Sequence, residues 1–325
     1  MKLRTILDDP AFDFQLDYSS GVITLGSCFS EVVGNYLQQH KFPVKSNPFG
    51  TVYNMKSVLD VIRNAVDDTL PEEHRIVSRE GLFFHLDYHS QFYSDSPQGL
   101  TGHIRSAGHD FRQFLSGARL LIITLGTSWV YAFEGDTVSN CHKLPASHFE
   151  KRFLGLDEQR ELLSLLISTV RRLNPHLKIM FTVSPVRHIK DGLTENGASK
   201  AVLRVICQEA VQNYPGTCYF PSYEVMMDDL RDYRFYRADL IHPNEVAENH
   251  ICTLFMKSVV SEEARKISEE WGRVRQAMEH RPLNPGSASH RAFLLNLREK
   301  IKTFGPYFEV KEEAEEVEER LKAFG

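Results

Sequence analysis

The sequence predicts an α/β protein, built as a three-layer α/β/α sandwich around a mostly parallel sheet. Two observations carry this prediction. Short apolar runs rich in β-branched residues have the pattern of strands that are buried on both faces, and they lie at residues 22–25, 120–125, 179–183 and 217–220. Amphipathic helical patterns separate these runs, and the alternation of strand and helix is typical of a parallel sheet covered by helices.

The helices have recognisable ends. An amphipathic pattern runs from Glu31 to about residue 39, directly after the first strand. Apolar residues spaced three and four apart predict a helix over 162–173, which stops before Asn-Pro, and another over 202–211, which stops before Tyr-Pro-Gly. A last core helix is expected from 245 to about 260, with Asn244 as its N-cap.

Two regions interrupt or extend this pattern. Residues 55–118 combine helical segments (55–68 and 103–115) with a hairpin-like alternation at 82–93, which predicts an inserted, cap-like region within a domain spanning 1–260. Residues 261–325 predict a helical C-terminal extension, with breaks at 282–286 and 305–306. Its acidic end, at 311–321, favours a solvated helix or a partner contact.

Composition excludes several classes of protein. A chain of 325 residues with 42% hydrophobic and 25% charged residues can bury a sizeable core and is not expected to be disordered. A net charge of -5 gives no basic footprint, so a dedicated nucleic-acid binder is not expected. No apolar run approaches the ~18 to 20 residues that span a bilayer, and residues 1–10 lack the apolar core of a secretory signal. These features predict a cytoplasmic location without membrane attachment.

The five cysteines are odd in number, scattered and never in C-x-x-C pairs, so we expect free thiols and no disulfide framework. The 14 histidines show no established zinc spacing, and the glycines form neither a dinucleotide fingerprint nor a Walker loop. The sequence therefore predicts neither a metal nor an organic cofactor.

The strongest chemical signal is the Gly-Ser-Cys turn at residues 26–28. Glycine lets the chain turn sharply at the end of the first strand. The helix that follows directs its free N–H groups and partial positive charge toward an anion beside Ser27 or Cys28. Both side chains are potential nucleophiles. Capping of the helix by Ser27 and apolar burial of Cys28 are the structural alternatives.

A second constellation is Asp239 and His242, three residues apart and far along the chain. A carboxylate at this spacing can hold one imidazole nitrogen, which fixes the tautomer and leaves the other nitrogen free to act as a base. If the fold brings the two segments together, Cys28 or Ser27 supplies the nucleophile, His242 the base and Asp239 the orienting group. Alone, the pair is equally compatible with a turn that caps backbone donors.

Together these segments resemble the SGNH/GDSL hydrolase superfamily, and Gly-Ser-Cys-Phe-Ser at 26–30 is similar to the motif that names the GSCFA family. Further segments resemble that family, at 47–54, 124–131, 140–143, 183–188 and 231–236. The resemblance covers residues 20 to 255. It implies an SGNH-like fold and a hydrolase or acyltransferase that acts on an acyl ester, plausibly on a carbohydrate-type alcohol.

The resemblance also assigns candidate residues. Aligning the superfamily's Gly-Asp-Ser motif with residues 26–28 places Cys28 at the nucleophile position and Ser27 at the Asp position. The superfamily's third block usually carries an Asn that donates to the oxyanion, whereas Gly126 is followed here by Thr127 and Ser128. The remaining oxyanion or substrate-binding candidates are these: Ser128, Gly126, the backbone of Gly50, one of Asn47, Asn54 or Asn140, and the side chains of His89, Arg187 and His188.

Two other functions fit the same residues. One is a catalytically inactive carbohydrate- or acyl-binding module that kept the fold and lost the Asn of the third block. The other is an interaction protein that uses the acidic tail.

Overall fold

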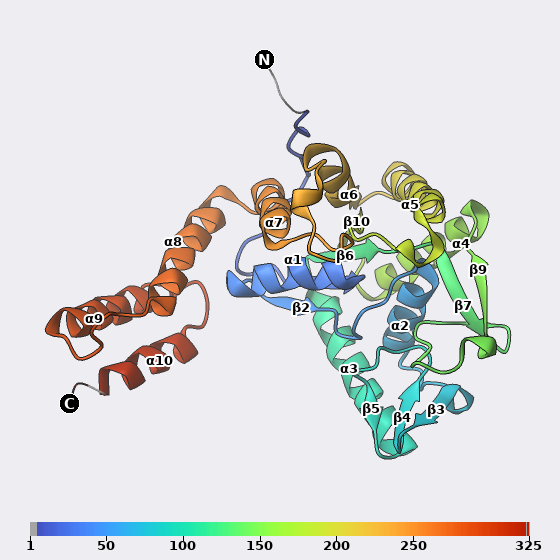
Figure 1. Cartoon of the computed structure of the whole chain (residues 1–325), viewed down its shortest axis with the longest axis horizontal. Coiled ribbons are helices and arrows are strands. Elements are labelled where there is room, and N and C mark those ends of the chain that lie inside the picture. Colours follow the sequence, from blue (N-terminus) through green and yellow to red (C-terminus); the bar gives the residue numbers. More distant parts are fainter. Residues whose placement is uncertain (1–4, 323, 325) are drawn as a thin grey trace.

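The computed structural model describes residues 5–322 and 324, and it has the predicted three-layer α/β/α architecture (Figure 1). Within this part of the chain the main sheet has five parallel strands in the order β11-β10-β6-β1-β2. They are β1 (Val22–Gly26), β2 (Val44–Ser46), β6 (Leu120–Leu125), β10 (Lys178–Val183) and β11 (Thr217–Tyr219). The four predicted strands are confirmed. The edge strand β2 was not predicted, because a three-residue Val-Lys-Ser segment carries no apolar run.

The register of the sheet brings several strand ends to one edge. β1 pairs with β6 from Val22↔Leu120 to Gly26↔Thr124, and β10 pairs with β6 as far as Val183↔Leu125. Since all these strands are parallel, the turns that follow β1, β6 and β10 lie at the same carboxyl edge. Ligands of open α/β sheets usually bind at this edge.

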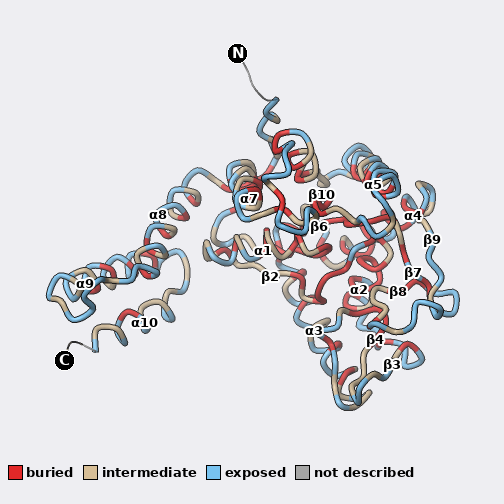
Figure 2. The backbone as a smooth tube through the Cα atoms, in the orientation of Figure 1, coloured by how far each residue is buried: buried red, intermediate tan, exposed pale blue. Residues whose placement is uncertain are grey.

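Helices cover both faces of the sheet, and each face has its own apolar cluster. One face carries α1 (Cys28–Gln39) and α7 (Glu245–Val259), and the other carries α2 (Met55–Asp67), α3 (Pro97–Gly117), α4 (Leu156–Leu173) and α5 (Leu193–Asn213). Figure 2 shows that buried residues concentrate in the strands and on the helix faces turned toward them. Asn244 caps α7 as predicted, accepting the Ala247 N–H at 3.1 Å.

Residues 55–118 are partly an element of the sandwich itself. The apolar faces of α2 and α3 pack into the cluster that covers the sheet. Only a small antiparallel sheet projects from this layer, formed by β3 (Ile76–Arg79), β4 (Leu82–His85) and β5 (Tyr93–Ser94) after a 3-10 turn at Glu73–Arg75 (Figure 1). The predicted hairpin is the β4–β5 pair.

A second small antiparallel sheet was not predicted. It consists of β7 (Trp129–Phe133), β8 (Asp136–Val138) and β9 (Phe149–Phe153), with a 3-10 turn at Ala146–His148 before β9. β8 has three residues and the centre of β9 is charged, so only β7, which is apolar and aromatic, has the composition of a strand. Beyond β10 and β11 the chain forms short turns, at Ile189–Asp191, α6 (Ser222–Glu224), a π-helical turn Val225–Asp229, and Tyr233–Phe235.

The C-terminal extension consists of α8 (Glu262–Glu279), α9 (Ala288–Lys302) and α10 (Lys311–Lys322), separated where the breaks were predicted. These helices bury their own apolar cluster around Trp271. They contact the body at the end of α1, where the Trp271 indole donates to the Gln39 carbonyl at 3.2 Å and Glu313 of the acidic helix pairs with Lys41 at 2.5 Å. No helix in the described part of the chain has both the length and the apolar character needed to cross a membrane.

Candidate active site

The turn from β1 into α1 places Cys28 at the first position of a helix. Gly26 has φ 137°, and a Cβ there would lie 2.2 Å from the Thr124 carbonyl oxygen, so no other residue fits. Its N–H donates to Asn47 Oδ1 at 3.0 Å, and the Ser27 N–H donates to Thr124 at 3.0 Å. Cys28 is therefore held at the carboxyl edge of the sheet by contacts to two neighbouring segments.

The environment of the Cys28 thiol has opposing effects on its ionisation. Burial and the nearby Glu31 carboxylate raise the pKa of Cys28, while the N–H groups of Phe29 and of Cys28 itself, together with the charge of Lys200, act to lower it. The raising effects are larger, so the resting site holds a thiol and needs a base to form the thiolate.

Ser27 differs from Cys28 in exposure. Its side chain is fully buried, whereas Cys28 is partly exposed. The Ser27 hydroxyl does not cap α1 and has no hydrogen-bond partner in the region that the structure describes. Of the two candidate nucleophiles, only Cys28 faces open space.

Asp239 and His242 form the hydrogen bond expected from their spacing. His242 Nδ1 lies 2.7 Å from Asp239 Oδ2, while Asp239 Oδ1 accepts the N–H groups of Ile241 at 2.9 Å and His242 at 3.0 Å. These backbone donors, followed by the imidazole, lower the pKa of Asp239 to about 2. Leu240 adopts φ 59°, which closes the turn tightly enough for these contacts. At neutral pH, Asp239 is thus an ionised carboxylate that is hydrogen-bonded to His242.

Cys28 and His242 line one cavity of about 480 Å³, although they lie far apart in the sequence. The cavity runs along α1 from Cys28 to Gln39, opposite the amino-terminal part of α7, and much of its lining is polar: Glu31, Asn35, Gln39, Arg237, Glu248 and Asn249. None of the lining residues comes from 55–118, so the inserted region does not cover this cavity. The juxtaposition brings a thiol and an imidazole to one space that can hold a polar molecule.

Several groups predicted to bind the oxyanion form hydrogen bonds with other parts of the protein. The Gly50 N–H donates to the Asn47 carbonyl at 2.7 Å, and Asn54 caps α2 by accepting the Ser57 N–H at 2.9 Å. The Ser128 hydroxyl donates to the Ser199 carbonyl at 3.1 Å and is fully buried. The structure therefore gives these groups packing roles, which short sequence motifs do not reveal.

The other two asparagines have similar roles. Asn47 accepts from Gly26, and its amide donates to Glu31 at 3.3 Å. Asn140 donates to Ser90 at 3.3 Å. Neither residue lines the cavity that contains Cys28.

His188 lies against the turn that follows β6, at Gly126. A Cβ at position 126 would lie 3.1 Å from His188 Nε2 and 3.3 Å from Ser27 Cβ, so glycine lets the imidazole approach the nucleophile turn closely. Burial lowers the pKa of His188 to about 4, and nearby Lys200 lowers it further in the same direction. Nε2 is buried and has no hydrogen-bond partner among the residues described. A neutral imidazole with an unused nitrogen therefore sits beside the β1 turn.

Arg187 and His89 support neighbouring loops. The Arg187 guanidinium stacks over Tyr236 at 4.4 Å and Tyr233 at 5.3 Å, and the backbone N–H of Arg187 donates to the Ile241 carbonyl at 3.3 Å. It thereby braces the loop that carries His242. His89 packs onto Gly50, whose φ is 72°.

One helix turn of α5, which the sequence motifs did not single out, holds the loops at the strand ends. Asn196 accepts the His188 N–H at 2.9 Å, Ser199 accepts the Ser128 N–H at 2.7 Å, and Lys200 donates to the Ser184 carbonyl at 2.7 Å. Lys200 is 1% exposed. A lysine in a helical pattern predicts a solvated face, so only the tertiary structure reveals this residue.

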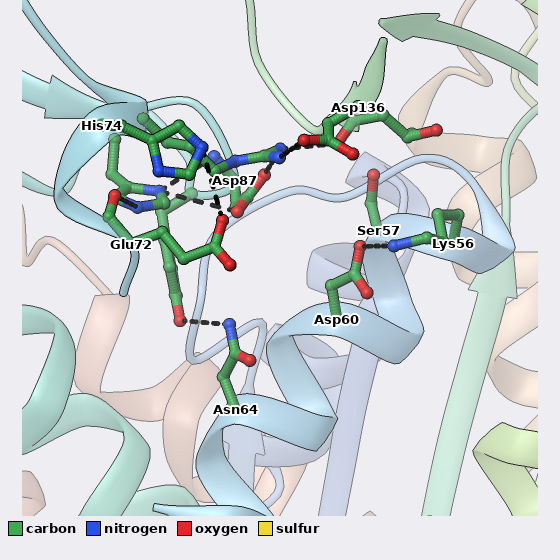
Figure 3. A network of polar contacts seen from close by, with 12 residues as sticks. Lys56, Ser57, Asp60, Asn64, Glu72, His74, Asp87 and Asp136 are labelled. Atoms are coloured by element: carbon green, nitrogen blue, oxygen red, sulfur yellow. Dashed lines mark hydrogen bonds and ion pairs between the residues drawn. The ribbon is translucent and has the colours of Figure 1, made fainter. Parts of the chain in front are cut away.

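A second cavity, of about 350 Å³, lies between α2 and the segment at 69–75, with Asp87 and Asp136 also in its lining. Figure 3 shows polar contacts of several of these groups. The buried guanidinium of Arg75 donates to Asp87 and, at 2.6 Å, to the Thr137 carbonyl. Lys56 pairs with Asp60 at 2.5 Å on α2. No set of three or more His, Cys, Asp or Glu side chains within 5–322 and 324 is arranged to hold a metal ion.

The chain combines a parallel α/β/α sandwich with a Gly-Ser-Cys turn after β1 and an Asp-His pair before the last core helix. It belongs to the GSCFA family, whose model matches residues 21–255. The model of the GSCFA domain protein C-terminal domain matches residues 271–323.

Solved structures with a similar overall arrangement include three esterases. The family 3 carbohydrate esterase of Clostridium thermocellum is 10% identical, with a TM-score of 0.37 over 74% of this chain and 94% of that chain. A family 3 carbohydrate esterase from Talaromyces cellulolyticus is 10% identical, with a TM-score of 0.35 over 78% and 99%. The acetyl xylan esterase Est2A from Butyrivibrio proteoclasticus is 12% identical, with a TM-score of 0.36 over 74% and 63%. No curated protein sequence matches the chain significantly.

Proposed function

We propose that this protein is an ester hydrolase or acyltransferase that uses Cys28 as its nucleophile, His242 as base and Asp239 as orienting group. The observation that carries the proposal is the shared cavity, which the Cys28 and His242 side chains both line. The buried position of Ser27 favours the thiol over the hydroxyl as the attacking group.

The proposed reaction has two steps. His242 Nε2 accepts the Cys28 proton while the sulfur attacks the acyl carbonyl, and Asp239 holds the imidazolium that forms. Collapse of the tetrahedral intermediate breaks the bond to the alcohol, which leaves with the proton from His242, and a thioester remains on Cys28. Water then repeats the sequence in reverse to release the acid, or a second alcohol takes the acyl group.

Two kinds of donor support the oxyanion in this proposal. The N–H groups of Cys28 and Phe29, at the amino terminus of α1, already point toward the sulfur. A neutral His188 can donate from Nε2, which has no other partner in the described structure. His188 would thereby take the role that an Asn of the third block has elsewhere in the superfamily.

The polar lining of the cavity supports a hydroxyl-rich alcohol as the carrier of the acyl group. Amide side chains of Asn35, Gln39 and Asn249, with the carboxylate of Glu31, offer both donors and acceptors. Such a lining suits a carbohydrate-type ester better than a long apolar chain. A thiol nucleophile without disulfides is consistent with a reducing compartment, and we propose a cytoplasmic location.

A catalytically inactive acyl- or carbohydrate-binding module is the second candidate. The raised pKa of Cys28 and the commitment of Ser128 and Gly50 to packing favour it. In that case the cavity would bind the same ligands without turnover.

A panel of acetyl and longer acyl esters of sugars and of a chromogenic phenol tests the proposal. We expect turnover by the wild-type protein, and an acyl adduct on the peptide containing Cys28 in mass spectra of the quenched reaction. Cys28→Ala and His242→Ala should abolish turnover while circular dichroism and the melting temperature stay unchanged. Ligand binding without turnover by the wild type would favour the binding module, and an adduct on Ser27 would contradict the assignment of the nucleophile.

A further inference from the structure

The cavity beside Cys28 is longer than an acyl group requires. Its lining on α1 follows one stripe of the helix, with residues three or four apart, from Cys28 through Asn35 to Gln39. At a rise of 1.5 Å per residue this stripe is about 16 Å long. Cys28 and His242 occupy one end of the cavity, so most of its length lies beyond them.

Helix α7 forms the opposite wall, which makes the cavity a groove between two helices. Cys28 opens α1, and His242 lies just before the N-cap of α7. Both helices cover the same face of the sheet (Figure 1). The lining on α7 again follows one helix stripe, at Glu245, Glu248 and Cys252. A molecule longer than an acyl group can therefore extend along the groove away from Cys28.

The charges of the groove disfavour an anionic ligand. Carboxylates line it at Glu31, Glu245 and Glu248. Arg237, which also lines it, pairs with Glu248 at 2.6 Å. Glu31 accepts the Thr51 hydroxyl at 3.1 Å, a contact that orients the carboxylate without neutralising it. Since like charges repel, the groove suits a chain without phosphate or carboxylate groups.

The C-terminal extension holds the far end of the groove. The Trp271 indole donates to the Gln39 carbonyl at 3.2 Å, and Arg275 of α8 donates to Gln39 Oε1 at 3.3 Å. In the next residue, His40 Nδ1 lies 2.8 Å from Ser268 Oγ. Because Arg275 engages the oxygen of the Gln39 amide, the two N–H groups of that amide can donate to a ligand.

We propose that Gln39, positioned by Arg275, forms a distal subsite of this groove, and that the acyl carrier is an extended, hydroxyl-rich chain without negative charge, such as an oligosaccharide. This inference rests on the proposed function, because it places the acyl group between Cys28 and His242. The units remote from the ester then follow α1 as far as Gln39. A single sugar ring is too short to reach both ends, so the subsite selects for chain length.

Calorimetric titration with sugars that carry no acyl group tests the subsite without any turnover. Cellotetraose should bind the wild-type protein at least about tenfold more tightly than glucose, because it gains contacts along α1. Gln39→Ala and Arg275→Ala should each lower this preference about fivefold, the effect of losing one hydrogen bond, and Arg275→Lys should restore part of it. Arg273→Ala is the matched control, since Arg273 is exposed on α8 and does not line the groove; it should keep the preference.

Steady-state kinetics separates positioning from a merely structural role of Arg275. The substrates are acetylated glucose and acetylated cellotetraose. In Arg275→Ala the loss should fall on KM for the long ester rather than on kcat, because only binding of the remote units is weakened. A lower kcat for both esters would mean that Arg275 supports the fold instead, and would overturn its role as a positioning residue.

Equal binding of cellotetraose and glucose, or a preference that Gln39→Ala leaves intact, would overturn the inference. Binding of tetragalacturonate as tight as that of cellotetraose would overturn the assignment of an uncharged chain. If Arg275→Ala does not fold, the preference of Gln39→Ala decides alone. Turnover of short esters with no preference for the longer sugar would reject the inference and leave the proposed function standing. A preference that Gln39→Ala removes, in a protein that turns over no ester, would support the subsite and reject the proposed function.

Discussion

His85 is buried and His188 is half-buried, and burial lowers the pKa of both to about 4, but their ring nitrogens are used differently. In His85, Nδ1 accepts the Asp87 N–H at 3.2 Å, so Nε2 donates to the Glu72 carbonyl at 3.1 Å. In His188, Nε2 meets no partner in the described residues.

The same contrast separates two groups of side chains. We call Arg75, His85 and Asp87 the insert cluster, and Ser27, His188 and Lys200 the strand-edge cluster. The insert cluster pairs its charged groups with one another and with neighbouring carbonyls, and of its side-chain atoms only Nε of Arg75 is buried without a partner among the described residues. Such pairing suits a structural network. The strand-edge cluster leaves buried polar atoms without partners, a feature that suits a site awaiting a ligand or a reaction.

The largest effect should come from the nucleophile beside the strand-edge cluster. Cys28→Ala should lower kcat/KM for an acyl ester by at least ~10⁴-fold, because nucleophile and base act as a unit. His242→Ala should lower it equally, and the double variant should be no worse than either. Steady-state kinetics checks this, and additive losses would contradict a shared mechanism.

In the insert cluster the largest effect should be on stability. Arg75→Ala should lower the free energy of unfolding by about 3 to 5 kcal/mol, because it leaves the buried Asp87 carboxylate without its guanidinium. Urea unfolding measures the loss. Asp87→Asn in the same chain should recover part of it, and the alkylation rate of Cys28 should stay unchanged in both variants.

Substitution of His188 and substitution of His85 should have different effects on kcat. His188→Gln should lower kcat by about 100-fold, as expected when one oxyanion donor is lost, with little change in KM. His85→Gln is the matched control and should keep kcat within about twofold of the wild type. Equal losses of activity in the two variants would show that the unused Nε2 of His188 has no special role.

The two histidines should contribute equally to the loss of stability in acid. Each has a folded pKa of about 4, below the unfolded value of about 6.5. The unfolded chain therefore binds more protons between these values, and stability falls as the pH decreases through this window, by about 3 kcal/mol per histidine. Urea unfolding from about pH 7 to about pH 4 should show a smaller loss in either Gln variant; an unchanged slope would mean that neither imidazole stays neutral.

The smallest effect should come from Ser27. Its hydroxyl is buried without a partner in the residues that the structure describes, so Ser27→Ala should change the free energy of unfolding by no more than about 1 kcal/mol, in the stabilising direction. Ester turnover should be nearly unchanged. A large loss of turnover in a folded Ser27→Ala protein would move the nucleophile from the thiol to the hydroxyl.

Local patterns in the sequence were enough for most of the architecture. The strands at β1, β6, β10 and β11 are fully apolar segments between breakers, and the ends of α7 follow from Asn244 and the helical period. The small sheets were harder, because strands such as β8 have three residues and depend on their neighbours for pairing. The edge strand β2 escaped prediction for the same reason.

The candidate site was likewise predictable only where its contacts are local in the sequence. The Gly26 turn and the Asp239–His242 bond depend on residues close in sequence, so spacing alone was informative. The oxyanion candidates were different, because the commitment of Ser128 to Ser199 depends on a contact between distant segments. No local pattern shows whether a hydroxyl is hydrogen-bonded within the protein or available to a ligand.

By itself, then, the sequence determined the sandwich, the Gly-Ser-Cys turn and the Asp239–His242 pair, since each follows from short-range backbone and side-chain preferences. Only the tertiary structure decided that Cys28 and not Ser27 lines the cavity, that α1 and α7 form its walls, and that Lys200 is buried. Burial and charge coupling are sums over neighbours from many segments, and those neighbours exist only once the chain has folded.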